Sequence, residues 1–312
     1  MISGGILLLG PGGQVGWELR RALAVLGPVT ARGRDAADGA GDLSCPDRVA
    51  DDIRTLRPAV VVNAAAHTAV DRAESEPDVA RTVNTEAPGA IARACADIGA
   101  WMVHYSTDYV FDGTGDRPWR ESDPTGPCNV YGTTKRDGED AVRAAGGRHL
   151  ILRTSWVHGA HGANFVKTML RLAAEKDRLA VVADQFGAPT GADLIADATA
   201  HALRACVSDA DLGGTYHLCA AGCATWHDVA TFAIARARSR FSDIAWTVGE
   251  IAPTTTDAYP TPARRPANSR LDTAKLRAAF GIHLPDWTDG VARLVDWCGA
   301  PPPPPFGRTR TP

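Results

Sequence analysis

Tyr131 and Lys135 are four positions apart in the run NVYGTTKRDGE, residues 129–139. On a helix, residues i and i+4 lie on one face, a turn apart. A phenol with a pKa of about 10 is a poor proton donor or acceptor at neutral pH, but a nearby ammonium favours the phenolate and brings the pKa toward the working range. The spacing therefore predicts a tuned proton donor, although an ordinary tyrosine on a surface helix would show the same pattern.

A hydroxyl residue upstream of this pair favours the chemical interpretation. The run HYSTDYVFDG, residues 104–113, ends a predicted strand, and ligands bind at such ends in open α/β sheets. Thr107 and Tyr131 could both hydrogen-bond a carbonyl oxygen, with Tyr131 delivering a proton as hydride arrives and Lys135 holding ribose hydroxyls. Together they predict carbonyl reduction, with Thr107, Tyr131 and Lys135 as the catalytic residues.

The elements that must position these residues alternate between short apolar runs and helical patterns. Near-continuous apolar strands, such as AVVVNAAA at 59–66, indicate burial on both faces. The pattern predicts an α/β fold, a Rossmann-like, doubly wound parallel sheet. The expected strands are 5–10, 28–33, 59–66, 101–107 and 149–155, and the expected helices are 14–27, 47–58, 78–99 and 131–145.

Glycines at positions 10, 13 and 16 in GPGGQVG separate the first predicted strand from the first predicted helix. They allow a tight turn and let the backbone approach a pyrophosphate, which the helix N-terminus stabilises. The spacing Gly-x-x-Gly-x-x-Gly points to the short-chain dehydrogenase/reductase group. The predicted dinucleotide turn consists of Gly10, Gly13, Gln14, Val15 and Gly16.

The end of the second predicted strand separates NADP binders from NAD binders, because an arginine favours the 2′-phosphate and an acid favours the 2′-hydroxyl. Here Arg32 and Arg34 precede Asp35. We therefore predict NADPH, and NADH is the alternative if the arginines are only solvated. The other predicted cofactor contacts are Asp42 and Leu43 at the adenine, Ala64, Ala65 and Ala66 along the cofactor, and the catalytic Tyr131 and Lys135.

The pattern changes after residue 155, where helices are predicted at 164–177 and 192–206 and irregular structure at 253–269. We expect an NADP-binding Rossmann domain over 1–155, joined by about 192–219. A smaller C-terminal α/β substrate-binding lobe is expected over 156–191 and 220–300. The proline-rich segment 301–312 cannot build a core and is expected to be an extended or disordered tail.

Composition argues against several other classes of protein. A formal net charge of -3 and a pI near 6.3 give no basic excess for nucleic acid, and no apolar run approaches the ~20 residues of a membrane span. Seven scattered cysteines without a Cys-x-x-Cys pair favour free thiols in a reducing compartment. The run HLCAAGCATWH at 217–227 offers four soft ligands, but it reads as a strand and a helix start rather than a zinc site. We expect a cytoplasmic protein without nucleic-acid or membrane partners.

Motifs between residues 5 and 296 resemble those of the dTDP-4-dehydrorhamnose reductase family of extended short-chain dehydrogenase/reductases. They include GPGGQVGWEL, VVNAAAHTAVDRAESEP, HYSTDYVFDG, NVYGTTKRDGE, RTSWVHG, DQFGAPTGADL and YPTPARRPANSRLD. The resemblance implies NADPH-dependent reduction of the 4-keto group of dTDP-4-dehydro-L-rhamnose to dTDP-L-rhamnose. The implied contacts with the dTDP-sugar are Ser106, Thr107, Asp108, Tyr109, Trp156, Asn164, Lys167, Gln185 and Arg265.

The resemblance is incomplete where some relatives are described as binding Mg²⁺ at a dimer contact built from glutamates. Glu18 matches one such position, Asp193 stands where glutamate is usual, and the proline-rich end breaks the pattern at a third. The sequence therefore argues against a metal, with Glu18 and Asp193 as the candidate ligands, and leaves a homodimer open.

Three alternative functions stay open. A dehydratase usually follows the catalytic threonine with Asp-Glu, whereas this chain has Asp108-Tyr109, and an epimerase generally holds NAD. A non-catalytic NADP-binding regulatory subunit would not require Thr107, Tyr131 and Lys135 together. A reductase of another dTDP-4-keto-deoxysugar, such as the dihydrostreptose type, would share these residues, and pocket contacts worth ~1–3 kcal/mol each would separate the two.

Overall fold

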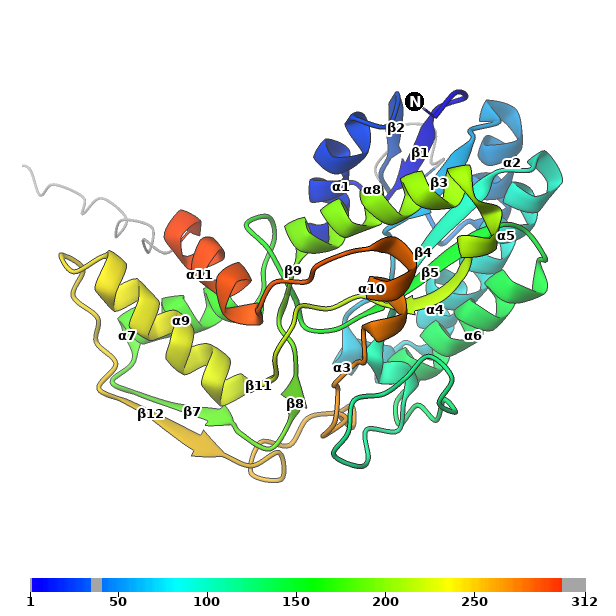
Figure 1. Cartoon of the computed structure of the whole chain (residues 1–312). Coiled ribbons are helices and arrows are strands. Elements are labelled where there is room, and N and C mark those ends of the chain that lie inside the picture. The colour runs from blue at the N-terminus through cyan, green and yellow to red at the C-terminus, as the bar shows by residue number, and fades with distance from the viewer. Residues whose placement is uncertain (1, 35–40, 299–312) are drawn as a thin grey trace, which may run out of the picture.

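A six-stranded parallel sheet forms the centre of the computed structural model, which describes residues 2–34 and 41–298 (Figure 1). The strand order is β10-β5-β4-β3-β1-β2, and every neighbouring pair is parallel. This confirms the predicted Rossmann-like sheet. The strands are β1 (Ile6–Leu9), β2 (Val29–Arg32), β3 (Val60–Asn63), β4 (Trp101–Thr107), β5 (His149–Thr154) and β10 (Gly214–His217).

Helices cover both faces of this sheet. Alternate strand residues point to opposite faces, so Ile6 and Leu8 pack under one helical layer while Leu7 and Leu9 pack under the other. Burial on both faces explains why these strands are apolar throughout. One layer holds α1 (Gln14–Ala24), α8 (Ala192–Ser208) and α10 (Ala274–Phe280), and the other holds α2 (Pro46–Leu56), α5 (Ala87–Ile98) and α6 (Val130–Ala144).

The chain after β5 divides its residues between the sheet and a second, smaller part. Helix α8 packs along α1, and β10 extends the sheet beside β5, so both lie with the sheet. The expected domain division stays a prediction. The smaller part has its own apolar core and contains α7 (Phe165–Glu175), α9 (Trp226–Arg240), α11 (Trp287–Cys298) and the parallel pair β7 (Arg178–Val182) and β12 (Glu250–Thr254) (Figure 1). The described residues contain two further pairs of short strands. In these pairs β6 (Val157–His158) lies beside β9 (Thr190–Gly191), and β8 (Phe186–Gly187) lies beside β11 (Ala224–Thr225).

Two local predictions are confirmed with small corrections. The stretch expected to be irregular at 253–269 is irregular from 255 on, and only its first two residues belong to β12, whose Pro253 is tolerated because an edge strand does not need every N–H. The helix expected at 78–99 runs from 77 to 98 but changes its geometry on the way. Because Pro88 has no N–H for the Asn84 carbonyl, the segment contains a π-helical turn. Its pieces are α4 (Pro77–Arg81), the turn η1 (Thr82–Glu86) and α5, and the separate short helix α3 (Val70–Ser75) precedes them.

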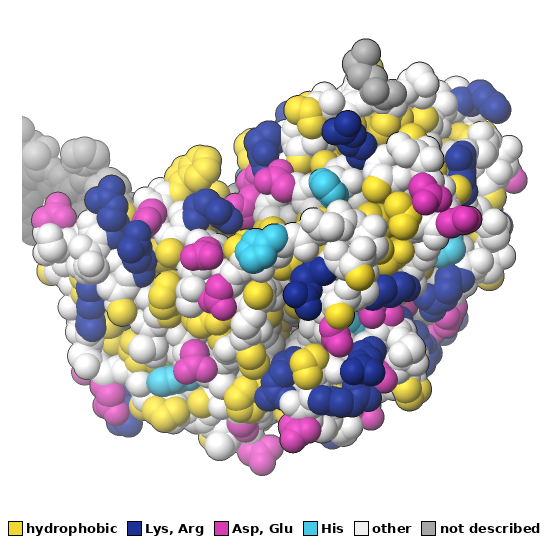
Figure 2. Space-filling model, viewed as in Figure 1, with side chains coloured by type: hydrophobic (Ala, Val, Ile, Leu, Met, Phe, Trp, Pro, Cys, Tyr) yellow, Lys and Arg dark blue, Asp and Glu magenta, His cyan; other side chains and the backbone are white. Residues whose placement is uncertain are grey.

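Charged side chains of both signs are interspersed over both parts of the face seen in Figure 2. Among the described residues, none of the helices has the length and apolar character needed to cross a membrane. Asp35 and the expected tail at 301–312 lie outside the described residues.

Helix α6 approaches the π-helical turn so closely that Gly138 is required at the contact. A Cβ at Gly138 would overlap the carbonyl oxygen of Asn84. We expect Gly138→Ala to lower the free energy of unfolding by about 1–3 kcal/mol, the usual cost of overpacking, in urea titrations. Gly249→Ala is the control, because the nearest atom to its Cβ would be Asp177 O at 3.7 Å, and it should stay within about 0.5 kcal/mol of wild type. Equal stability of the two variants would contradict the packing argument.

Candidate active site

A cavity of about 450 Å³ lies at the carboxyl ends of β3, β4 and β5, where a doubly wound sheet binds its ligands. Residues of the smaller part, including Trp226, close its far side. The cavity brings together many of the residues singled out from the sequence. They are Gly13, Gln14, Val15, Ala64, Ala66, Ser106, Thr107, Asp108, Tyr109, Tyr131, Lys135 and Trp156.

The three predicted catalytic side chains meet in this cavity. Thr107 is the last residue of β4, and Tyr131 and Lys135 project from the first two turns of α6. Tyr109 presents its ring edge-on to Tyr131, with the ring centroids 5.7 Å apart. The structure therefore brings a hydroxyl, a phenol and an ammonium to one site, as the sequence predicts.

The start of helix α6 is fixed from three sides. The Asn129 side chain caps the helix by accepting from Gly132 N at 2.7 Å, and Glu74 of α3 accepts from Val130 N at 2.8 Å. A Cβ at Gly132 would overlap the Tyr109 carbonyl oxygen, so the helix starts tightly against the end of β4. These contacts set the position of Tyr131 relative to Thr107.

Burial controls the protonation of the site more strongly than the lysine does. Burial raises the pKa of Tyr131 to about 12, and a hydrogen bond with Thr107 offsets only part of this. Lys135 Nζ donates to Tyr105 O at 2.6 Å, and burial lowers the pKa of Lys135 to about 8. The expectation that the ammonium brings the tyrosine pKa down is therefore wrong here. Tyr131 keeps its proton at neutral pH, but the raised pKa makes the phenol a weaker acid, so release of that proton requires a charge that stabilises the phenolate.

Asp108 is a further titrating group beside these residues. It is buried and accepts a hydrogen bond from the Thr107 hydroxyl at 3.0 Å. Burial raises the pKa of Asp108 to about 7, and the Thr107 hydrogen bond counteracts burial. Its charge therefore changes near neutral pH, close to the predicted proton donor.

The glycine turn before α1 has the shape of a dinucleotide cradle. Gly10 has a φ of +77°, and a Cβ there would lie 2.7 Å from Ala65 N. A Cβ at Gly16 would overlap the Gly10 carbonyl oxygen. Gly13 precedes α1 without a side-chain cap, which leaves the first N–H groups of the helix for an anion. The turn thus fits a pyrophosphate.

The residues predicted at the adenine end of the cofactor lie outside the cavity. Arg32 ends β2, and its Nε is 3.6 Å from Asp52 Oδ2 of α2, while Arg34 is exposed. Asp42 accepts from Ser44 N at 3.0 Å, and Leu43 is buried. Their contacts with the cofactor stay predictions.

A second cavity of about 400 Å³ shares Trp226 with the first. Trp226 stacks on Trp156 with centroids 3.7 Å apart, and it donates to Gln185 Oε1 at 3.1 Å. Trp156 has a φ of 48°, a conformation that a residue with a Cβ adopts only at a cost of order 1–3 kcal/mol. Sequence reasoning missed Trp226, whose only signal is a tryptophan at the start of a predicted helix. Gln185 and Arg265 also line this cavity.

Arg265 and Lys167, the two cations among the predicted contacts with the dTDP-sugar, have different surroundings. Arg265 makes two hydrogen bonds to Asp71 of α3, at 3.1 and 2.7 Å, on the wall of the second cavity. Lys167 donates to the carbonyls of Ala160 and Gly162 instead. Asn164 caps α7, and its Nδ2 donates to Gln14 Oε1 at 3.1 Å, so it ties the smaller part to the glycine turn. Neither Asn164 nor Lys167 lines the two cavities, and their substrate contacts stay predictions.

The candidate metal ligands are paired with arginines. Glu18 is 3.4 Å from Arg21, and Asp193 is 2.8 Å from Arg293, on a third cavity of about 500 Å³. Within residues 2–34 and 41–298, no three histidine, cysteine or acidic side chains gather as metal ligands, the run 217–227 included.

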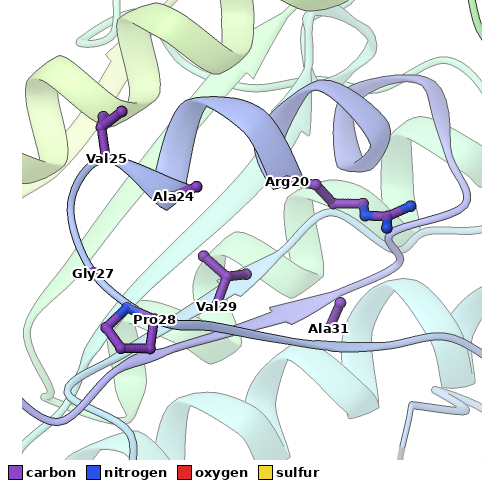
Figure 3. A pocket seen from close by; sticks show the side chains of 7 residues that line it. All are labelled: Arg20, Ala24, Val25, Gly27, Pro28, Val29 and Ala31. Carbon is purple, nitrogen blue, oxygen red and sulfur yellow. The ribbon is translucent and has the colours of Figure 1, made fainter.

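A further hollow lies between α1 and β2, where Arg20 accompanies mainly small apolar residues, away from the catalytic side chains (Figure 3).

A glycine cradle that faces a tyrosine and a lysine across the carboxyl edge of a parallel sheet is the arrangement of a short-chain dehydrogenase/reductase. The comparisons with known proteins give the particular family. Residues 4–299 match the family described as RmlD substrate binding domain. The chain is 54% identical over 291 residues to dTDP-4-dehydrorhamnose reductase of Escherichia coli strain K12, covering 93% of this chain and 97% of that protein.

Solved structures agree with this relationship. A dTDP-4-dehydrorhamnose reductase from Clostridium acetobutylicum is 34% identical, with a TM-score of 0.83 over 94% of this chain and 99% of that one. The Bacillus anthracis enzyme in complex with NADP is 31% identical, with a TM-score of 0.81 over 93% and 98%. The chain belongs to the dTDP-4-dehydrorhamnose reductase family, which confirms the resemblance seen in its motifs.

Gly10 offers a direct test of the cradle. An alanine there must adopt an unfavourable φ and would crowd Ala65, so we expect Gly10→Ala to weaken NADPH binding about tenfold or more, measured by calorimetry. Gly12→Ala is the matched control in the same turn, because its Cβ would meet no described atom within 4 Å. Equal weakening in both variants, or none in Gly10→Ala, would contradict the assigned cradle.

Proposed function

We propose that this protein reduces the 4-keto group of dTDP-4-dehydro-L-rhamnose with NADPH to give dTDP-L-rhamnose. The observation that carries the proposal is the cavity itself, where Thr107, Tyr131 and Lys135 converge between a dinucleotide cradle and an aromatic wall. Relatives named as this reductase, one of them in complex with NADP, support the same reaction.

The chain's own residues handle the proton and the charge. The Tyr131 hydroxyl donates a hydrogen bond to the substrate carbonyl oxygen, and the Thr107 hydroxyl, which now donates to Asp108, would turn to donate to the same oxygen, so that both polarise the carbonyl. NADPH held by the glycine turn at Gly10, Gly13 and Gly16 would supply the hydride for carbon C4. Tyr131 gives its proton to the oxygen, and Lys135, held by Tyr105 O, compensates the negative charge left on the phenol. A protonated Tyr131 fits this direction of reaction, because the donor must arrive with its proton.

The rest of the substrate extends toward the smaller part. Trp156 and Tyr109 flank the sugar, and the second cavity beyond Trp226 receives the nucleotide. Arg265 on that wall is the cation for the diphosphate, which would take the place that Asp71 now occupies in its hydrogen bonds.

The cellular setting follows from the same chemistry. The described cysteines are free thiols, which supports a location in the cytoplasm, where NADPH is also maintained.

A homodimer would use the third cavity as its contact surface, beside which the side chains of Trp17 and Trp297 are 46% and 78% exposed. The alternative function that would use the same catalytic residues is reduction of another dTDP-4-keto-deoxysugar.

The proposed proton donor is tested with Tyr131→Phe. The variant should bind NADPH nearly as wild type does but turn over dTDP-4-dehydro-L-rhamnose slower by roughly two or more orders of magnitude, the usual scale of a lost proton donor. NADPH oxidation is followed by absorbance, with the substrate generated in situ and the product identified by NMR. Normal turnover in the variant would refute the mechanism. If the wild-type protein formed a product other than dTDP-L-rhamnose, the enzyme would be assigned to another sugar.

The pH dependence of kcat/KM reports the free enzyme, and we expect it to fall above about pH 8. The pKa of Lys135 lies near 8 rather than near 10.5, so its charge is present below pH 8 and is lost above it. Asp108→Asn is the control, because it removes the carboxyl whose pKa is about 7 and should leave the limb near pH 8 in place. A profile that stays flat to pH 10 would show that Lys135 does not titrate there.

A further inference from the structure

A buried ionic cluster lies directly behind the catalytic lysine. Glu139 follows Lys135 by one turn of α6 and is fully buried, and Arg153 of β5 is 3% exposed. Arg153 Nε and Nη2 donate to the two oxygens of Glu139 at 2.8 and 2.6 Å. Arg143, on the next turn of α6, adds a third bond at 3.2 Å. This carboxylate lies on the same helix face as Lys135.

A buried ionic cluster of this kind lowers the stability of the fold unless its charges also stabilise another group. Burying ions costs several kcal/mol each, and apolar replacements of a buried pair are often neutral or stabilising. Burial raises the pKa of Glu139, but the Arg153 guanidinium outweighs burial and leaves the pKa below its usual range. Glu139 therefore stays ionised throughout the neutral range, even though it has no exposure to water.

The cation that benefits is Lys135. Burial alone disfavours its ammonium, and the Glu139 charge opposes that effect. Two other groups near Lys135 supply no negative charge in the neutral range. Tyr131 on the same helix keeps its proton, and burial holds the pKa of His104 on β4 well below its ordinary value, so it is neutral. Asp108, which follows β4, is largely ionised above about pH 7, but Glu139 and not Asp108 is the charge that acts on the pKa of Lys135.

We propose that Glu139 is a positioning residue for Lys135, and that Arg153 and Arg143 hold its carboxylate ionised so that the buried ammonium stays charged and aimed at the active site. The proposal rests on the proposed function, because it assigns the cluster to the reductase mechanism. A purely structural role, in which the pair only ties α6 to β5, is the competing explanation.

Direct titration of Lys135 separates the two explanations. The chain has only four lysines, at 135, 167, 176 and 275, so lysine labelled with ¹³C at Cε gives a countable NMR spectrum. Lys135→Met assigns the signal. We expect a midpoint near pH 8 in wild type and a midpoint lower by about one unit or more in Glu139→Gln.

Glu139→Asp is the matched variant, because it keeps the charge and loses packing. We expect its Lys135 midpoint to stay within about 0.5 units of wild type although its melting temperature falls. Should Glu139→Gln fail to fold, the double variant Glu139→Gln/Arg153→Met removes the unpaired guanidinium and serves the same comparison. An unchanged Lys135 midpoint in a folded variant without the carboxylate would overturn the proposal, as would equal shifts in the Gln and Asp variants.

The alkaline limb of kcat/KM should shift to lower pH together with the NMR midpoint in Glu139→Gln. Because the NMR titration needs no substrate, it stays informative if the protein turns over a different sugar or none. A shifted midpoint without any turnover in wild type would therefore count against the proposed function and not against the electrostatic link. A shifted midpoint with an unmoved limb in an active enzyme would overturn the mechanistic role of Glu139.

Discussion

Burial of a parallel sheet on both faces is the constraint on which the rest of the molecule depends. Strands that are apolar throughout, such as β1 and β3, must be covered by α1 and α8 on one side and by α2 and α5 on the other. Parallel strands then all end at one edge, which is the place left open by the covering helices. Polar side chains gather at this edge because each strand delivers its next residues there.

Close backbone approach turns this edge into a binding site. The turn at Gly10 lies against Ala65, and α6 lies against both the Tyr109 and Asn84 carbonyls. A side chain at any of these contacts would push apart the elements that hold the cofactor cradle and the catalytic tyrosine. The glycines of the cradle carry a signal readable in the sequence, since their spacing follows the turn. Gly138 does not, because its partner is some fifty residues away along the chain.

How far the sequence predicts the site depends on whether a feature is local. The sheet, the cradle and the pair Tyr131 and Lys135 follow from periodicity and short spacing, and the structure brings them together. No local pattern predicts contacts between segments that are far apart in the sequence. Two such contacts are the pairing of Arg265 with Asp71 and the stack of Trp226 on Trp156. The raised pKa of Tyr131 was also beyond the sequence, because desolvation depends on everything that surrounds the phenol.

Burial has opposite consequences for the two titrating members of the pair. It favours the neutral phenol, which a proton donor needs, but it also favours the neutral amine, which would leave the phenolate without a counter-charge after proton transfer. A dry site therefore helps one half of the reaction and harms the other. A negative charge behind Lys135 resolves this conflict only if it is kept away from Tyr131, where it would raise the cost of forming the phenolate. Glu139, one helical turn farther from the cavity and held by Arg153, meets both requirements.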